Sequence, residues 1–149
     1  MSIDDLDQKI LQLLYRDGRA SFAEIGRKLG VSENTIRFRY NRMVKNGVIR
    51  GATVLVDHKK LGLANSAALM LRIDPSRIDL VLEELKEMRE VFNIYQLSGD
   101  YDAIAVVMGR DLGHIHEIVE RVKRIKGVLS VNTLVTLRVV KTETRYDLS

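Results

Sequence analysis

Side chains that can hydrogen-bond to base edges and phosphates are concentrated between residues 32 and 50. The apolar residues Ile36, Tyr40 and Met43 recur there at helical spacing, so we expect them to pack inward and leave the polar side chains exposed. Asparagine can pair with adenine, arginine with guanine, and threonine can contact a thymine methyl group. The segment therefore predicts contact with duplex DNA. The predicted DNA-binding residues are Ser32, Asn34, Thr35, Arg37, Phe38, Arg39, Arg42, Lys45 and Arg50.

These residues differ in the role that we expect of them. Arg42, Lys45 and Arg50 are placed to hold phosphates, which adds affinity without sequence information. Phe38 is a large apolar residue at a position that the helical spacing exposes, and it could contact a thymine methyl group. Two alternatives stay open: the helix phase differs by one residue, or the segment is only a solvated basic helix face.

The charge of the chain is distributed unevenly. The 149 residues carry a net charge of +4, but residues 1–60 hold 12 Lys and Arg against 7 Asp and Glu. Residues 61–149 hold 12 against 13. A basic segment joined to a nearly neutral one suggests that only the first part of the chain meets a polyanion.

Several kinds of chemistry are not expected from this composition. The chain has no cysteine, which excludes disulfides and thiolate sites. His114 and His116 are two residues apart in a predicted helix and so point in different directions. With no catalytic dyad or phosphate loop visible, we expect no catalytic residue, no metal and no cofactor. No secretory signal or membrane-spanning run is apparent, so we expect no membrane partner and a cytoplasmic location.

The basic segment belongs to a predicted helix-turn-helix. Ser21 and Glu24 form a capping-box pair, Gly30 supplies a turn, and Ser32 caps the next helix. Residues 48–56, with a break at Gly51, read as a strand that could form a wing. The predicted helices cover residues 4–15, 21–29 and 32–46.

The remainder of the chain alternates strand and helix. The order is β-α-β-β-α-β, a ferredoxin-like arrangement, so the fold class is α+β. We predict a winged helix-turn-helix domain over residues 1–56, a linker over 57–65, and a second domain over 66–149. The predicted strands are 67–73, 91–97, 103–108 and 131–140, and the predicted helices are 75–89 and 111–125.

The predicted strands are apolar on both faces. Leu69 and Leu71 belong to one face of their strand, and Ala68 and Met70 belong to the other. Two helices can cover only one face of the sheet, and an antiparallel sheet with a wet face should alternate cleanly. We therefore expect a homodimer formed through the second face. The alternative is a monomer whose tail covers that face.

Several stretches resemble the Lrp/AsnC (feast/famine) transcription regulators, over essentially the full length. They are Ile3-Asp4-Asp5-Leu6-Asp7-Gln8-Lys9-Ile10-Leu11, Ile25-Gly26-Arg27-Lys28-Leu29-Gly30-Val31-Ser32, Gly47-Val48-Ile49, Ser98-Gly99-Asp100-Tyr101-Asp102 and Gly127-Val128. The resemblance implies regulators that bind palindromic operators as dimers, which assemble further into tetramers or octamers.

The resemblance also implies an amino-acid effector. In the family it is held in clefts between dimers, near the loop that matches Gly99, Asp100, Tyr101 and Asp102, and Thr133 matches a position that supplies a hydroxyl. An aspartate there could take the ammonium group and backbone N–H groups the carboxylate. Some relatives bind no amino acid, and residues 99–102 could be a plain hairpin turn.

Two other functions fit the same architecture. A family of tetrapyrrole-decarboxylating proteins shares the two-domain plan, so a tetrapyrrole-modifying enzyme is one alternative. A metabolite-sensing subunit that has lost DNA binding is the other. The intact basic face of residues 34–45 argues against the second.

Overall fold

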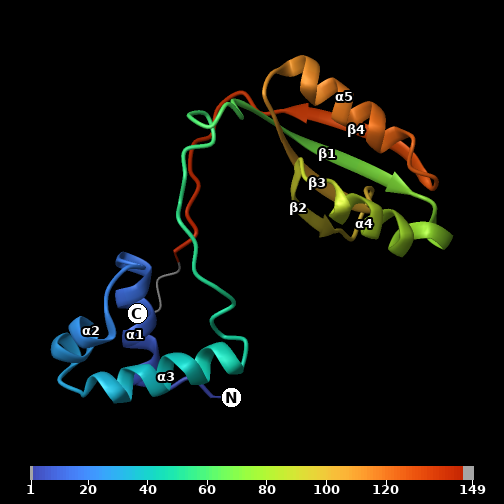
Figure 1. Ribbon diagram of the computed structural model, residues 1–149. Coiled ribbons are helices and arrows are strands. Elements are labelled where there is room, and N and C mark those ends of the chain that lie inside the picture. Colours follow the sequence, from blue (N-terminus) through green and yellow to red (C-terminus); the bar gives the residue numbers. More distant parts are fainter. Residues whose placement is uncertain (1, 146–149) are drawn as a thin grey trace. The chain divides into compact units, whose positions relative to one another are not determined.

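The computed structural model describes residues 2–145, which divide into two compact units (Figure 1). The N-terminal unit contains the residues up to Leu55 and also Lys141 to Arg145. The sheet unit covers Val56–Val140. Residues 141–145 therefore group with the N-terminal unit, whereas the predicted second domain continues to residue 149, which lies outside the described residues. The last strand of the sheet ends at Val135, so residues 141–145 are not part of the sheet.

Three helices form the N-terminal unit: α1 (Asp5–Arg16), α2 (Phe22–Leu29) and α3 (Glu33–Lys45). Each begins at a polar side chain that accepts a hydrogen bond from the first turn. Ser21 and Ser32 were predicted as the caps of α2 and α3, and both are confirmed. The cap of α1 is Asp4, which forms a capping box with Asp7 that was not predicted from the sequence.

The core of the N-terminal unit is a small apolar cluster. Ile10, Ile25, Ile36 and Met43 are fully buried, one or two from each helix. The Tyr40 ring packs on Phe22 with centroids 5.1 Å apart. Phe38 is 64% exposed. The predicted phase of α3 is therefore correct, and the alternative phase is ruled out.

The α2–α3 turn is tight because α2 carries Gly26. A Cβ added to Gly26 would lie 2.7 Å from the backbone oxygen of Val31 and 3.4 Å from the backbone nitrogen of Glu33. Contacts below 3.0 Å are not seen for real Cβ atoms, so only glycine fits. This close approach brings the start of α3 against the middle of α2.

The predicted strand over residues 48–56 is not formed, so the single chain has no wing. Within residues 2–145, no backbone–backbone hydrogen bond involves residues 50–56. A strand needs a neighbouring strand to satisfy its N–H and C=O groups, and the chain places none there. The segment is extended, and its apolar side chains Val54 and Leu55 are exposed.

The sheet unit has the predicted β-α-β-β-α-β order. Its antiparallel sheet has the strand order β2-β3-β1-β4, so β1 and β3 are central. Helices α4 and α5 pack on the same face (Figure 1). The elements are β1 (Asn65–Ile73), a 3-10 turn (Pro75–Arg77), α4 (Ile78–Glu87), β2 (Val91–Gln96), β3 (Ala103–Gly109), α5 (Leu112–Lys123) and β4 (Val128–Val135).

The two faces of the sheet differ in burial. Side chains under the helices, such as Leu69 and Val107, are fully buried. On the outer face, Met70 and Val106 are only partly buried although they are apolar. The prediction that β1 and β3 are apolar on both faces is therefore confirmed. β4 starts and ends earlier than predicted. Among residues 136–145, only Thr136 continues the pairing, by donating to the Ser66 carbonyl.

Candidate nucleic-acid interface and effector site

The start of α3 is held by hydroxyl groups. Ser32 Oγ accepts a hydrogen bond from the Thr35 backbone nitrogen at 3.1 Å. The two hydroxyl oxygens also lie 2.8 Å apart. These contacts give both residues a capping role, which satisfies donors that an α-helix leaves free in its first turn. Thr35 is only partly exposed, whereas Asn34 beside it is exposed.

The exposed stripe of α3 carries the groups suited to bases. Asn34, Arg37, Phe38, Asn41 and Lys45 are exposed and recur at helical spacing. Phe38, Asn41 and Lys45 line a shallow groove of about 410 Å³ together with Arg42 and Asn46. Asn41 was not among the predicted residues, although its amide has the same pairing capacity as that of Asn34.

Arg37 is exposed but not free of contacts. It pairs with Glu33 one turn earlier at 2.9 Å, and both side chains are about half exposed. Its guanidinium carbon lies 5.2 Å from the centroid of the Phe22 ring. An exposed pair of this spacing contributes only about 0.3–0.5 kcal/mol, so a phosphate or a base can compete for the arginine. Arg50 lies in the extended segment after the helix and is also exposed.

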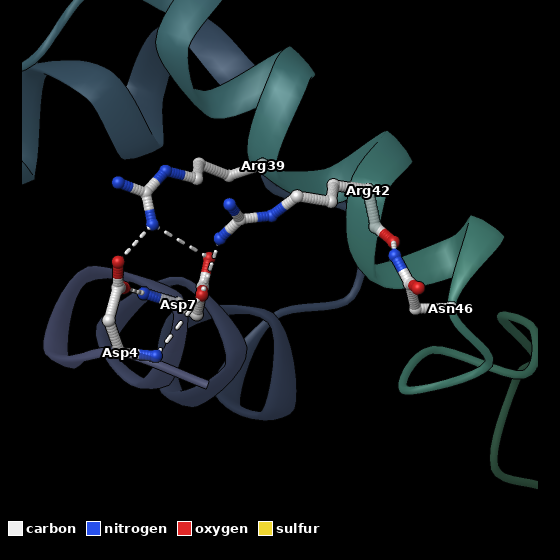
Figure 2. Close-up of polar contacts among 5 residues, drawn as sticks. All are labelled: Asp4, Asp7, Arg39, Arg42 and Asn46. Carbon is white, nitrogen blue, oxygen red and sulfur yellow. Dashed lines mark hydrogen bonds and ion pairs between the residues drawn. The ribbon is translucent and has the colours of Figure 1, made fainter. Parts of the chain in front are cut away.

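Two predicted DNA-binding arginines instead point at α1 (Figure 2). Arg39 pairs with Asp4 and, at 3.3 Å, with Asp7 Oδ1. Arg42 Nη2 donates to the other oxygen, Asp7 Oδ2, at 3.0 Å. The Asp7 side chain is fully buried, whereas those of Arg39 and Arg42 are 22% and 34% exposed. We refer to these four residues as the acid–arginine cluster.

The cluster shifts the titration of its exposed carboxyl. The hydrogen bond from Arg39 and the one from the Asp7 backbone nitrogen lower the pKa of Asp4 from its usual value of 3.8 to about 2. The same pairing raises the pKa of Arg39. A carboxylate that is stabilised in the folded state in this way favours folding whenever it is ionised.

Acid titration should therefore weaken the N-terminal unit through Asp4. Because its folded pKa lies below its unfolded pKa, its contribution is complete above 3.8 and is lost as the pH falls to about 2. Asp4→Asn keeps an N-cap acceptor but removes the charge. We expect the melting temperature of the wild type to fall more steeply over this interval than that of Asp4→Asn, measured by circular dichroism. Parallel curves would contradict this prediction.

The predicted effector loop is a hairpin between β2 and β3. Gly99 has φ of 114°, a left-handed conformation that favours glycine. Asp102 Oδ2 accepts a hydrogen bond from the Ile73 backbone nitrogen at 2.7 Å, at the bulge in β1. The Asp102 backbone nitrogen donates to the Leu71 carbonyl at 2.8 Å. Asp102 thus anchors the hairpin to β1, and Asp100 is the exposed carboxylate of the loop.

Tyr101 contacts two residues that were not predicted to belong to the site. Its hydroxyl lies 3.3 Å from Asn132 Nδ2, and the Arg72 guanidinium carbon lies 5.2 Å from its ring centroid. Thr133 is different, because it pairs with Leu69, a residue of the helix-covered face. Alternation along β4 puts Thr133 and Asn132 on opposite faces. Within one chain, Thr133 and Tyr101 are therefore not brought together.

The histidines make local contacts. His114 Nδ1 accepts a hydrogen bond from the Arg110 backbone nitrogen at 3.1 Å, and His58 packs edge-on against Phe92. Across residues 2–145, no three acidic, histidine or cysteine side chains are grouped as metal ligands. No helix in this part of the chain is long and apolar enough to cross a membrane.

Comparison with family models covers both units. Residues 3–44 match the AsnC-type helix-turn-helix domain, and residues 66–146 match the Lrp/AsnC ligand binding domain. The chain belongs to the Lrp/AsnC family of transcription regulators. As a member of the Lrp/AsnC family it combines a DNA-binding helix-turn-helix with a ligand-binding domain.

Individual Lrp/AsnC relatives align along nearly the whole chain. The HTH-type transcriptional regulator Ptr1 of Methanocaldococcus jannaschii is 36% identical over 140 residues, 93% of this chain and 95% of Ptr1. The regulator FL11 of Pyrococcus furiosus is 29% identical over 142 residues, 95% of this chain and 94% of FL11. Both are named as transcription regulators, so they lend no support to the tetrapyrrole-enzyme alternative.

Two solved structures of transcription regulators share the fold. Escherichia coli AsnC superposes with a TM-score of 0.91 at 28% identity, covering 97% of this chain and 99% of AsnC. A transcriptional regulator of Neisseria meningitidis in complex with L-Met superposes with a TM-score of 0.90 at 21% identity, covering 99% and 97%. At that identity the second comparison supports the fold alone.

Proposed function

We propose that this Lrp/AsnC regulator reads specific DNA sequences with the exposed stripe of α3, which inserts into the major groove. The observation that carries the proposal is the chemistry of that stripe. Asn34 and Asn41 offer amides, Arg37 offers a guanidinium, and Phe38 offers an apolar surface, all exposed on one side. These are the groups that discriminate base pairs in the major groove. Lys45 and Arg50 extend the positive charge toward the phosphates.

Sequence-specific binding has a direct test. Duplexes selected by the full-length protein from a random pool would be titrated against scrambled duplexes at two salt concentrations. We expect specific binding to exceed non-specific binding by at least about 10³-fold. Asn34→Ala should reduce the specific affinity about tenfold, since one good base contact accounts for about 1–3 kcal/mol of discrimination. Equal affinity for selected and scrambled duplexes would refute the proposal.

We further propose that a small amino acid is the effector and that it binds at the hairpin of residues 99–102. Asp100 offers a carboxylate for the ammonium group, while the Arg72 guanidinium and backbone N–H groups near Gly99 can meet the carboxylate. The L-Met complex of the Neisseria regulator, which has the same fold, supports this ligand class. Thr133 stays a prediction from the family resemblance, since it lies on the other face of the sheet.

Isothermal titration with a panel of amino acids would test the effector proposal. We expect one of them to bind the wild type and to change its DNA affinity, and Asp100→Ala to weaken that binding at least tenfold. Asp79→Ala, on the exposed side of α4, is the control. If no amino acid binds, the effector proposal fails, while the proposal for DNA reading stands.

We also propose a homodimer through the outer face of the sheet, which assembles further into a tetramer or octamer. The support is the row of apolar, partly exposed side chains on that face, among them Met70, Val106 and Leu134. A patch of this kind on a folded chain marks an interaction surface. In a dimer with a two-fold axis through this face, both copies of each side chain would be buried in the same interface.

Met70→Glu should separate such a dimer. The dimer interface would then bury two carboxylates, one from each subunit. Burying each one costs about 1–2 kcal/mol, so dimerisation should weaken about 100-fold. His116→Glu, on the exposed side of α5, adds the same charge away from the face and should leave assembly unchanged. Light scattering after gel filtration measures the mass. An unchanged assembly for Met70→Glu would remove the outer face from the interface.

The remaining proposals follow from DNA binding. We propose that the protein acts in the cytoplasm, where its DNA partner would be, and that it is a regulator and not an enzyme. The two regulators aligned above support this assignment.

A further inference from the structure

The acid–arginine cluster links α1 to the DNA-reading helix in a way that the proposed function does not use. Arg39 and Arg42 lie one turn apart on the flank of α3 that faces α1. Between them they engage both oxygens of Asp7, while Asp4 takes Arg39 from the other side (Figure 2). The two aspartates of the cluster lie at the start of α1, where Asp4 and Asp7 also form the capping box.

We propose that Asp7 is a positioning residue for DNA reading, and that Arg39 and Arg42 form ion pairs with Asp7 and do not contact DNA phosphates. The bridge fixes the rotation of α3, so that the stripe with Asn34, Arg37 and Phe38 faces the DNA. This inference rests on the proposed function, because it assumes that α3 reads the bases.

Burial supports this division of the arginines. Asp7 is fully buried, and its two oxygens are satisfied by arginines from α3 and by the Asp4 backbone nitrogen at 3.2 Å. An arginine that left for a phosphate would strand part of this charge in the protein interior, which is strongly unfavourable. Arg37 faces no such penalty, because its partner Glu33 is half exposed.

Arg42 also connects Asp7 to the exposed stripe. Its guanidinium carbon lies 6.0 Å from the centroid of the Phe38 ring, at the distance of a cation–π contact. Asp7 therefore acts on Phe38 through Arg42, and the orientation of this ring depends on a carboxylate of α1. Arg42 Nη2 donates to Asp7 Oδ2, whereas Arg42 Nε is buried and has no hydrogen-bond partner among the described residues.

The salt dependence of binding to a scrambled duplex separates phosphate contacts from structural arginines. Each phosphate contact that is lost reduces the slope of log affinity against log salt by about 0.9. We expect Lys45→Gln to reduce the slope by this amount per bound subunit, and Arg39→Gln to leave it unchanged. A reduction by Arg39→Gln equal to that of Lys45→Gln would overturn the inference.

Asp7→Asn tests the positioning role itself. It releases two arginines and misplaces α3, so we expect affinity for the scrambled duplex to hold or rise while affinity for the selected duplex falls about tenfold. A folding defect would lower both affinities together, so the ratio separates the two explanations. An unchanged ratio, or equal losses on both duplexes, would overturn the inference.

Asp4→Asn keeps the test decisive if Asp7→Asn does not fold. It retains the N-cap and removes only the charge that faces Arg39, so we expect a smaller loss of the same ratio with normal helix content. An unchanged ratio for this variant would count against the cluster. If the wild-type protein selects no duplex from the random pool, the proposed function fails. If the wild type is selective and the variants are equally selective, only the inference about the cluster fails.

Discussion

Gly26→Ala is expected to destabilise the N-terminal unit by about 3 kcal/mol, because the new methyl group would lie 2.7 Å from the Val31 carbonyl oxygen. The neighbour is backbone and belongs to the turn between α2 and α3, so it cannot move aside as a flexible side chain would. Relief requires α3 to shift relative to α2. DNA affinity should therefore fall as well, even for molecules that stay folded.

Guanidinium denaturation of the full-length protein, followed by circular dichroism, would measure this effect. Gly51→Ala is the matched control, since Gly51 has no positive φ and its added Cβ meets nothing within 4 Å. A change of at most about 0.5 kcal/mol is expected there, as at most surface positions. If Gly26→Ala were as mild as the control, the turn would be more tolerant than its geometry indicates.

Asp7→Ala is the second large effect, an expected loss of about 3 kcal/mol in the stability of the N-terminal unit. Removing one partner of a buried ion pair costs about 3–5 kcal/mol, and we take the low end because Arg39 and Arg42 are partly exposed and can be hydrated. The change also deletes one half of the capping box on α1.

Asp5→Ala is the control for this variant, because it removes a carboxylate from the same turn. Asp5 is 79% exposed and pairs with Lys9 across one helical turn at 2.7 Å. Such pairs contribute about 0.3–0.5 kcal/mol. Similar losses for the two variants would mean that the cluster adds no more than an ordinary surface pair.

Local signals accounted for most of the secondary structure. The S-x-x-E box at Ser21 and the cap at Ser32 act over three residues, so their effect can be read without the fold. The lack of apolar–polar alternation in β1 also predicted an outer face that is apolar. The expected strand over residues 48–56 failed for the opposite reason, because a strand forms only beside a partner, and local pattern says nothing about whether one is present.

The candidate site was harder to predict where it depends on contacts between residues far apart in the sequence. Asp7 and Arg39 are 32 residues apart, and their pairing depends on how α1 packs against α3. From sequence, Asp7 belonged only to a stretch that resembles the family, and Arg39 was assigned only to DNA. The same limit hid Arg72 and Asn132, which meet Tyr101 only because of the strand register. A stripe of exposed polar residues, by contrast, follows from helical spacing alone.

The central claim is that the exposed stripe of α3 reads the bases. Repeating the selection with proteins substituted in this stripe tests the claim most directly. Wild-type, Asn34→Ala and Arg37→Ala proteins would each select duplexes from the same random pool. We predict that each variant loses preference at particular base pairs of the half-site and keeps it at the others. If all three proteins selected the same sequences with the same preference at every position, the bases would be read elsewhere and the account would be wrong.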